Sequence, residues 1–302
     1  MLDGGRGQEC LFRRLETHGP VNPDKSAVCR SVKGHEHVKL RTRFAPAPTG
    51  HLHLGHVHNA IHVWEFAKSR GARVILRIED HDRQRARSEF EDSIREDLAW
   101  LGFEPDEEAS RQSERDAEYR AVVAALDRRG LVYGCGCSRQ EISAASRGNP
   151  DELRYPGTCR DRGLGLDDGR GWRVRMTPGT ESFVDGILGA ATQDPSSQCG
   201  DVLIRDRLGN WTYQFAVAVD DFLQDVTHVI RGVDLLASTG RQIRLARLAG
   251  RVTPAVFRHH GLIMRTPTQK LSKSHGDSGI RELRGQGWSA EDVIARARTG
   301  AV

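Results

Sequence analysis

Five histidines lie within twelve residues in the segment FAPAPTGHLHLGHVHNAIH, which covers residues 44–62. Imidazoles at this density allow three interpretations: a metal site, a solvated histidine-rich loop, or a nucleotide site. The helical spacing of His58 and His62 would place both on one face, as a metal requires. A metal is nevertheless disfavoured, because no carboxylate or cysteine lies among the histidines and zinc prefers a closed ligand set. The five are His51, His53, His56, His58 and His62.

The nucleotide interpretation rests on the turn formed by His53, Gly55 and His56. Helical spacing begins after Gly55, so these residues would flank a helix N-terminus, whose N–H groups and partial positive charge suit a phosphate. Glycine allows a base or ribose to approach the backbone closely. The two imidazoles can donate hydrogen bonds to oxygens that gain charge during phosphoryl transfer. The site would lie at the carboxyl end of the first strand of a doubly wound sheet, where such ligands bind.

A second segment with phosphate-binding chemistry follows about 215 residues later, after another predicted strand. It contains two lysines and two serines within five residues. Taken alone, this composition is typical of an exposed surface loop. The segment is Lys270-Leu271-Ser272-Lys273-Ser274.

Three of the six cysteines are closely spaced at Cys135, Cys137 and Cys159, with Tyr155 between them. They allow two interpretations, small buried hydrophobic residues or a metal site. The surrounding region is charged and glycine-rich and has little apolar core of its own, so a structural metal would supply folding energy. Cys10, Cys29 and Cys199 lack any partner pattern.

Composition limits the class of protein. The 302 residues suffice for one large domain or two small ones, and 37% hydrophobic content supports a real core. A net charge of +4 is compatible with a polyanionic partner without requiring one. No apolar run approaches the roughly 18 residues of a membrane span, and the N-terminal residues lack the apolar stretch of a secretory signal. We therefore expect a soluble, cytoplasmic protein without disulfides or membrane contact.

The candidate residues are positioned by a predicted strand–helix–strand unit. Alternation from Val38 to Phe44 indicates a strand, helical spacing follows Gly55 as far as Gly71, and RVILRI reads as a buried strand. Such a unit predicts a parallel sheet, and hence an α/β, Rossmann-like fold. Residues 1–37 show no sustained period and are expected to be a disordered extension.

The remaining pattern predicts several further elements. Two helices are expected at 88–103 and 114–130, and another at 234–250. A hairpin is predicted for DVLIRDRLGNWTYQFAVAVDD, turning at LGN. A last helix opens with the capping-box spacing of Ser289 and Asp292. Further short strands are expected in the segments WRVRM, SFVDGI and VTHVIRG.

Together, the HLGH turn and the KLSKS loop resemble the paired signatures of class I aminoacyl-tRNA synthetases, which bind ATP between them. The segment RFAPAPTGHLHLGH is similar to the pattern of the glutamyl branch, as are LRIEDHD, YQFAVAVDD and VIRGVDLLAST. These motifs span residues 41 to 274, most of the chain. Ala47 departs from the family, which often has Ser at this place.

Only 28 residues follow the KLSKS loop, too few for a second domain with its own core. The chain therefore most resembles a truncated family of this branch, the glutamyl-queuosine tRNA(Asp) synthetases. The resemblance implies a monomer that activates L-glutamate with ATP and Mg²⁺ and transfers it to queuosine at the wobble position of tRNA(Asp). Two alternatives are a catalytic-core-only glutamyl-tRNA synthetase that charges a tRNA 3′ end and an inactive paralogue that binds tRNA or nucleotide.

The resemblance also implies roles for individual residues and segments. His53, His56 and Lys273 would be catalytic, and Gly55 and residues 270–274 would also contact ATP. Residues 38–130 and 201–302 would form the catalytic domain, with residues 131–200 as an inserted acceptor-binding subdomain. That subdomain would hold one Zn²⁺ through Cys135, Cys137, Tyr155 and Cys159. The glutamate would be bound by Arg43, Phe44, Ala45, Pro46, Ala47, Glu79, Tyr213 and Arg231.

Overall fold

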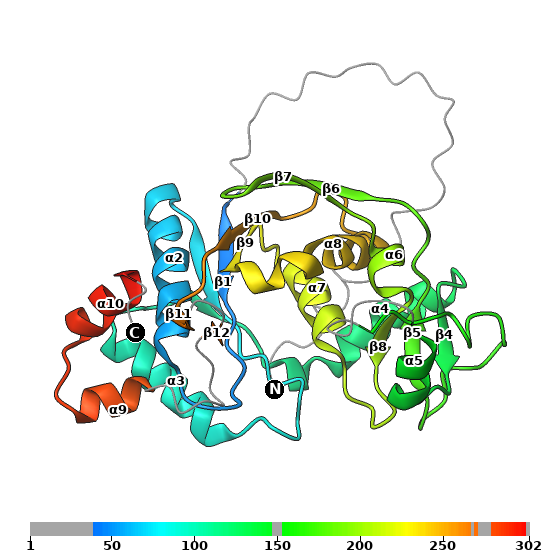
Figure 1. Cartoon of the computed structure of the whole chain (residues 1–302), viewed down its shortest axis with the longest axis horizontal. Helices are drawn as coiled ribbons and strands as arrows, with labels where there is room; N and C mark the ends of the chain where they lie inside the picture. Colours follow the sequence, from blue (N-terminus) through cyan, green and yellow to red (C-terminus); the bar gives the residue numbers. More distant parts are fainter. Residues whose placement is uncertain (1–38, 147–152, 267–268, 271–278, 300–302) are drawn as a thin grey trace, which may run out of the picture.

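The computed structural model describes residues 39–146, 153–266, 269–270 and 279–299 (Figure 1). The predicted extension at 1–37 and residues 271–274 of the KLSKS loop lie outside these ranges. Within them, no helix is both long and apolar enough to cross a membrane.

The predicted site residues are positioned by short parallel strands. Strand β2 pairs in parallel with β1 on one side and β3 on the other, and β9 pairs in parallel with β10. The Thr227 N–H, one residue before β9, donates to the carbonyl of Arg41 in β1 at 2.9 Å, so β9 lies beside β1. The predicted parallel sheet is confirmed. The strands are β1 (Arg41–Phe44), β2 (Arg73–Leu76), β3 (Glu107–Glu108), β9 (His228–Gly232) and β10 (Val256–His260).

Helix α2 (Leu54–Arg70) connects β1 to β2, as predicted. Its apolar side, which includes Val57 and Ile61, is buried against the sheet in a core that also takes in Phe44. Gly71 ends the helix in the left-handed conformation, with φ of 63°, which glycine adopts without steric cost.

Further helices pack beside the parallel strands and α2, and one of them, α4, packs instead against the antiparallel strands. Ser289 and Asp292 cap the last one reciprocally, with N–H to side-chain distances of 3.1 and 3.2 Å, which confirms the predicted capping box. That helix packs along α2 (Figure 1). The helices are α3 (Ser88–Trp100), η1 (Gln112–Glu114), α4 (Asp116–Asp127), α9 (Ile280–Gly285) and α10 (Ala290–Thr299).

The segment between the two groups of parallel strands is antiparallel. Strand β5 pairs with β4 and β8, and β6 pairs with β7 in a hairpin that lies over β10 (Figure 1). Two short helices accompany these strands. The elements are β4 (Val132–Cys135), α5 (Arg139–Ala145), β5 (Gly171–Val174), β6 (Glu181–Asp185), β7 (Gly189–Gln193), α6 (Pro195–Cys199) and β8 (Val202–Arg205).

The hairpin predicted for residues 201–221 is wrong in its second half. The turn forms, and Trp211 makes one antiparallel bridge to Arg205, but the chain then enters α7 (Tyr213–Leu223). All seven side chains from Phe215 to Asp221 are buried, because α7 packs between the antiparallel sheet and α8. A helix buried on all sides shows no polar stripe, so its sequence resembled a strand. The remaining elements are η2 (Val233–Ser238), α8 (Thr239–Leu248), β11 (Met264–Thr266) and β12 (Gln269–Lys270).

Candidate active site and cysteine cluster

The two histidines of the HLGH turn cap the N-terminus of α2 with their own side chains. His53 is the N-cap residue, and its Nδ1 accepts from the Gly55 N–H at 3.0 Å. His56 returns the contact, because its Nδ1 accepts from the His53 N–H at 3.1 Å. A neutral imidazole that accepts at Nδ1 carries its proton on Nε2. Both rings are therefore fixed in the tautomer that can donate through Nε2, beside a helix N-terminus that attracts anions.

Gly55 makes this arrangement possible. A Cβ atom at this position would lie 2.9 Å from Cε1 and 3.0 Å from Nδ1 of the His53 ring. The ring would have to move, and the cap would be lost. The glycine that the sequence suggested for close approach of a ligand is thus required for the approach of His53 itself.

A cavity of about 450 Å³ brings most of the predicted site residues together. The first turn of α2 forms one wall. Polar side chains come from β1 (Arg43), from the segment after β2 (Glu79) and from β9 (Arg231). Phe44 and Pro46 do not line the cavity, and the side chain of Phe44 lies in the apolar core against Trp64. Leu271, Ser272, Lys273 and Ser274 lie outside the described residues, and for Lys270 only the backbone, in β12, is described. The predicted residues in the cavity wall are Arg43, Ala45, Ala47, His53, Gly55, His56, Glu79, Tyr213 and Arg231.

A buried ion network supports the floor of this cavity. Asp221 accepts from Arg43 Nε at 3.2 Å and from Arg77 Nη1 at 2.8 Å, and Arg77 Nη2 also bonds Glu79 at 2.9 Å. Burial raises the pKa of Asp221, but Arg43 and Arg77 outweigh it and hold the pKa below its ordinary value. Glu79 therefore both pairs with an arginine and lines the cavity, so it presents a negative charge of fixed position.

Arg231 lies in β9 and lines the cavity, and hydrogen bonds to buried side chains fix its guanidinium. Its guanidinium donates to Gln242 at 2.6 Å, to Thr239 at 2.9 Å and to His259 Nε2 at 3.0 Å. His259 is oriented in turn by Asp185, 2.6 Å from its Nδ1. Burial lowers the pKa of Arg231 to about 10, so the side chain stays cationic at neutral pH.

The three predicted metal-binding cysteines form a cluster. The Sγ atoms of Cys135, Cys137 and Cys159 all lie within 4.8 Å of one another, and Cys137 Sγ is 3.5 Å from Cys159 Sγ. The Tyr155 hydroxyl lies 3.4 Å from Cys135 Sγ and 3.9 Å from Cys137 Sγ. The four predicted ligands therefore converge on one point.

The protonation of the cluster favours a cation. Burial opposes ionisation of Cys159, but hydrogen bonds from the Gly136 N–H and from Cys137 and Tyr155 lower its pKa to about 7. Burial raises the pKa of Cys137 to about 11, with a further contribution from its hydrogen bond to Cys159. One thiolate is thus available near neutral pH, and a metal would deprotonate the others. Three thiols and a phenol at these separations fit a tetrahedral Zn²⁺.

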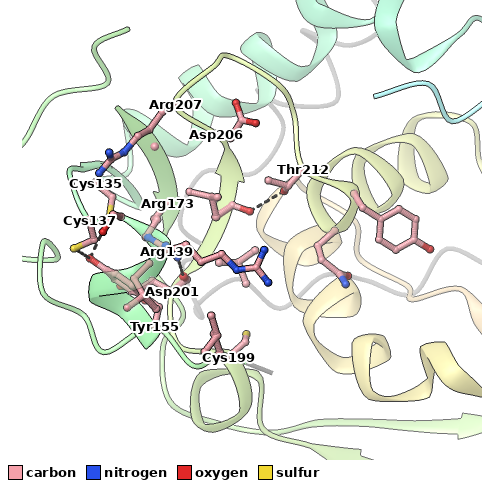
Figure 2. A pocket seen from close by; sticks show the side chains of 18 of the residues that line it. Cys135, Cys137, Arg139, Tyr155, Arg173, Cys199, Asp201, Asp206, Arg207 and Thr212 are labelled. Atoms are coloured by element: carbon pink, nitrogen blue, oxygen red, sulfur yellow. Dashed lines mark hydrogen bonds between the residues drawn. The ribbon is translucent and has the colours of Figure 1, made fainter. Parts of the chain in front are cut away.

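A second cavity, of about 680 Å³, lies between the cysteine cluster and α7 (Figure 2). Cys135, Cys137 and Tyr155 gather on one side of it, and Thr212 lies on the other (Figure 2). Tyr213 lines both cavities, so they meet at this residue. Four arginines also line the second cavity: Arg139, Arg173, Arg207 and Arg241.

Sequence reasoning missed Asp221 as a site residue. It lies on α7 and joins two arginines beneath the cavity. The available signal was the pair Asp220-Asp221 at the end of an apolar run, since two buried carboxylates need partners. Asp220 finds its own in Tyr119 at 2.9 Å and Arg115 at 2.8 Å.

The sequence of this chain matches a family model described as "tRNA synthetases class I (E and Q), catalytic domain" over residues 39–299. Since this is most of its length, the chain belongs to that family. Among curated relatives, a glutamyl-Q tRNA(Asp) synthetase of Burkholderia cenocepacia is 42% identical over 80% of this chain and 82% of its own length. A Bordetella bronchiseptica protein of the same name is 46% identical over 78% of this chain and 75% of its own length.

Glutamate–tRNA ligases are also similar. Glutamate–tRNA ligase 1 of Acidithiobacillus ferrooxidans is 38% identical over 85% of this chain but only 56% of its own length. A crystal structure of a glutamate tRNA ligase from Elizabethkingia meningosepticum, in complex with its amino acid, has a TM-score of 0.68 and 32% identity. That alignment covers 79% of this chain and 53% of the ligase, so this chain spans about half the length of that ligase.

Proposed function

We propose that this chain is a ligase that activates L-glutamate with ATP and transfers it to queuosine at the wobble position of tRNA(Asp). The observation that carries the proposal is that residues from four separated motifs line one cavity at the start of α2. Relatives named glutamyl-Q tRNA(Asp) synthetase are 41–46% identical to this chain, and the alignments cover 75–82% of their length.

In the first step, a carboxylate oxygen of glutamate attacks the α-phosphorus of ATP. The new P–O bond gives glutamyl-adenylate, and the bond to pyrophosphate breaks. The carboxylate is already ionised, so the protein has to position the reactants and stabilise charge. His53 and His56 would donate to phosphate oxygens through Nε2. Lys273, which lies outside the described residues, would hold the leaving pyrophosphate, and Mg²⁺ would accompany ATP.

The amino acid would occupy the part of the cavity between β1 and β9. Arg43 or Arg231 can pair with a carboxylate of glutamate, and Glu79 can accept from its ammonium group. Tyr213 would close the cavity on the side of the antiparallel region, with Ala45 and Ala47 on the loop after β1.

In the second step, a hydroxyl of the acceptor attacks the carbonyl carbon of the adenylate. An ester bond forms, AMP leaves, and the hydroxyl proton passes to solvent. The second cavity, with its arginines and its contact with Tyr213, is the proposed route of the acceptor nucleoside. One Zn²⁺ held by Cys135, Cys137, Tyr155 and Cys159 would stabilise the wall of this route, and we expect a cytoplasmic monomer.

Glutamate-dependent exchange of pyrophosphate into ATP, measured without tRNA, tests the first step. We expect exchange at millimolar glutamate, and a decrease of about 10²-fold or more for Lys273→Ala. Absence of exchange with the wild-type chain would contradict activation and favour the binding-only paralogue.

Transfer of labelled glutamate tests the second step with three substrates: queuosine-containing tRNA(Asp), unmodified tRNA(Asp) and tRNA(Glu). We expect label only on the first. Periodate destroys the diols of both queuosine and the 3′ ribose, and rebuilding the 3′ end alone should not restore labelling. Equal charging of tRNA(Glu) would instead identify a catalytic-core glutamyl-tRNA synthetase.

A further inference from the structure

A second group of potential metal ligands lies behind the HLGH turn and has no part in the proposed reaction. His58 and His62 occupy successive turns of α2, and His260 ends β10. If one ring nitrogen is taken from each histidine, the three nitrogens all lie within 4.8 Å of one another. The sequence disfavoured a metal at these histidines because no carboxylate or cysteine lies among them to close the ligand set, and only His58 and His62 were expected to share a face. The fold adds the third from a distant part of the chain.

Backbone carbonyls fix which nitrogen two of these rings can offer. His58 Nδ1 lies 2.8 Å from the carbonyl oxygen of Ala297 in α10, and His260 Nδ1 lies 2.7 Å from that of Gly261. A carbonyl can only accept, so both rings donate at Nδ1 and present the Nε2 lone pair. An Nδ1–H···O=C bond of this kind is the usual support of a metal-binding histidine.

The rings are also packed as a unit. His62 and His260 are stacked, with centroids 4.4 Å apart and planes 6° apart, and His58 lies 4.7 and 5.0 Å from them. Burial lowers the pKa of His62, and it lowers that of His260 to about 4.

Access and ligand type indicate which ion would bind. His58, Asn59 and His260 line the first cavity, so the cluster can be reached from it. Asn59 Oδ1 is placed 2.9 Å from His260 Nε2, but a ring that donates at Nδ1 accepts at Nε2, so the amide has to turn its NH2 group toward the ring. An ion would take over this contact. The charged groups near His62 act in opposite directions: Glu65 favours a cation there, whereas Arg258 and Arg298 disfavour one. The type of ligand atom therefore decides which ion would bind. A hard ion such as Mg²⁺, which prefers oxygen ligands, is disfavoured, whereas imidazole suits Zn²⁺, Ni²⁺, Cu²⁺ and Co²⁺.

We propose that His58, His62 and His260 form a binding site for one divalent transition-metal ion, separate from the cysteine cluster. The ion would join α2 to the end of β10, and through the bond from His58 to Ala297 it would also hold α10. It would lie in the wall of the cavity that receives ATP. The proposal does not depend on the proposed function, because binding can be measured without ATP, glutamate or tRNA.

Titration of the purified full-length chain with Co²⁺ tests the site, using calorimetry and the visible spectrum. Cobalt bound by imidazoles shows weak d–d bands alone, whereas cobalt bound by thiolates adds strong charge-transfer bands. We expect uptake of an ion with no charge-transfer band. His62→Gln should lower the affinity for this ion at least about 10-fold, the smallest loss seen when even a supporting residue is removed.

Two further variants secure the interpretation. His58→Gln should show the same loss of affinity, and both changes replace partly exposed side chains in a long helix. His51→Gln is the matched control, since His51 lies in the same segment, bonds Ser93 and is outside the cluster. The proposal is overturned if wild-type protein takes up no cobalt beyond thiolate sites, or if His62→Gln and His58→Gln bind it as tightly as His51→Gln.

Discussion

The two candidate sites are held in place in opposite ways. The HLGH turn begins a 17-residue helix whose buried side joins a large apolar cluster shared by β1, β2, α3 and α10. Among the described residues, the apolar cluster around the cysteines has four buried side chains, and three of them are predicted ligands: Tyr133, Cys135, Tyr155 and Cys159. The first site is therefore formed by ordinary hydrophobic burial, whereas the second lacks enough of it.

This difference predicts which region depends on a ligand for its structure. The parallel region should fold without ATP or glutamate, because its site residues are already fixed by helix capping and buried ion pairs. The region around Cys135 should depend on bound zinc, as small domains with little core do. The following changes test the comparison, from the largest expected effect to the smallest.

Cys159→Ser should cause the greatest loss. We expect loss of the bound zinc and a decrease in unfolding free energy of about 4 kcal/mol or more, because a structural metal contributes its binding energy to folding. Zinc content by elemental analysis and thermal unfolding measure both effects. Cys199→Ser is the control, since Cys199 is buried but lies outside the group formed by Cys135, Cys137 and Cys159. Its Sγ lies 3.0 Å from the carbonyl oxygen of Pro195 and 3.4 Å from that of Gly200. Zinc-free wild-type protein of normal stability would refute the dependence.

His56→Ala should impair chemistry far more than folding. Loss of one donor to the phosphate should lower the rate of ATP–pyrophosphate exchange about 10²- to 10³-fold. Loss of half the helix cap should lower the unfolding free energy by only about 1 kcal/mol. Exchange kinetics and urea unfolding separate the two, with His51→Ala as the matched histidine control. If His56→Ala is strongly destabilised but its folded fraction exchanges pyrophosphate at the normal rate, His56 has a structural role and not a catalytic one.

Asp97→Asn should stabilise the parallel region. Asp97 is 1% exposed, and burial raises its pKa to about 6, above the ordinary value of about 3.8. The native chain therefore binds more protons than the unfolded chain between about pH 4 and 6, and stability falls as pH rises through this window. Removing the charge should raise the unfolding free energy at pH 7.5 by about 1–3 kcal/mol.

Unfolding curves at several pH values measure this effect. The dependence on pH between 4 and 7 should flatten in Asp97→Asn. Asp92→Asn, on the exposed side of the same helix, should leave both the stability and its pH dependence unchanged. Equal responses of the two variants would show that Asp97 carries no buried charge at neutral pH.

Arg207→Ala should have the smallest effect, and only on the second step. The side chain lines the second cavity and bonds the carbonyl of Gly136 beside the cysteine cluster. If it contacts an RNA phosphate, its removal should weaken transfer several-fold. The slope of log affinity for tRNA against log salt concentration should become shallower by about one. Pyrophosphate exchange, which requires no tRNA, should not change. A parallel loss in both assays would assign Arg207 a structural role.

The sequence predicted the local elements around the HLGH turn well. Helix α2, its end at Gly71 and the capping box at Ser289 follow from side chains close in sequence, which set helix ends. The four predicted metal ligands also lie together, although their spacing alone left a packing role open. Phe44 and Pro46 were predicted from a motif, and the cavity wall does not include them. Phe44 ends β1, where successive side chains point to opposite sides, so its neighbour Arg43 faces the cavity and Phe44 faces the core.

Contacts between distant segments could not be predicted. The helix at Tyr213–Leu223 read as a strand because packing on all sides removes the polar stripe that identifies a helix. The bond from Arg43 to Asp221 depends on how α7 packs beside β1, and the position of His260 beside His58 depends on how β10 lies next to α2. Such pairings depend on the whole fold and leave no local periodicity.

The reciprocal cap formed by His53 and His56 has a consequence for how this site responds to change. Each ring is ordered by the backbone of the other residue before any ligand arrives, so binding loses little side-chain entropy and the pair is preorganised. Substitution of either residue also releases its partner. Losses from His53→Ala and His56→Ala should therefore overlap rather than add, and the two imidazoles behave as a single functional unit.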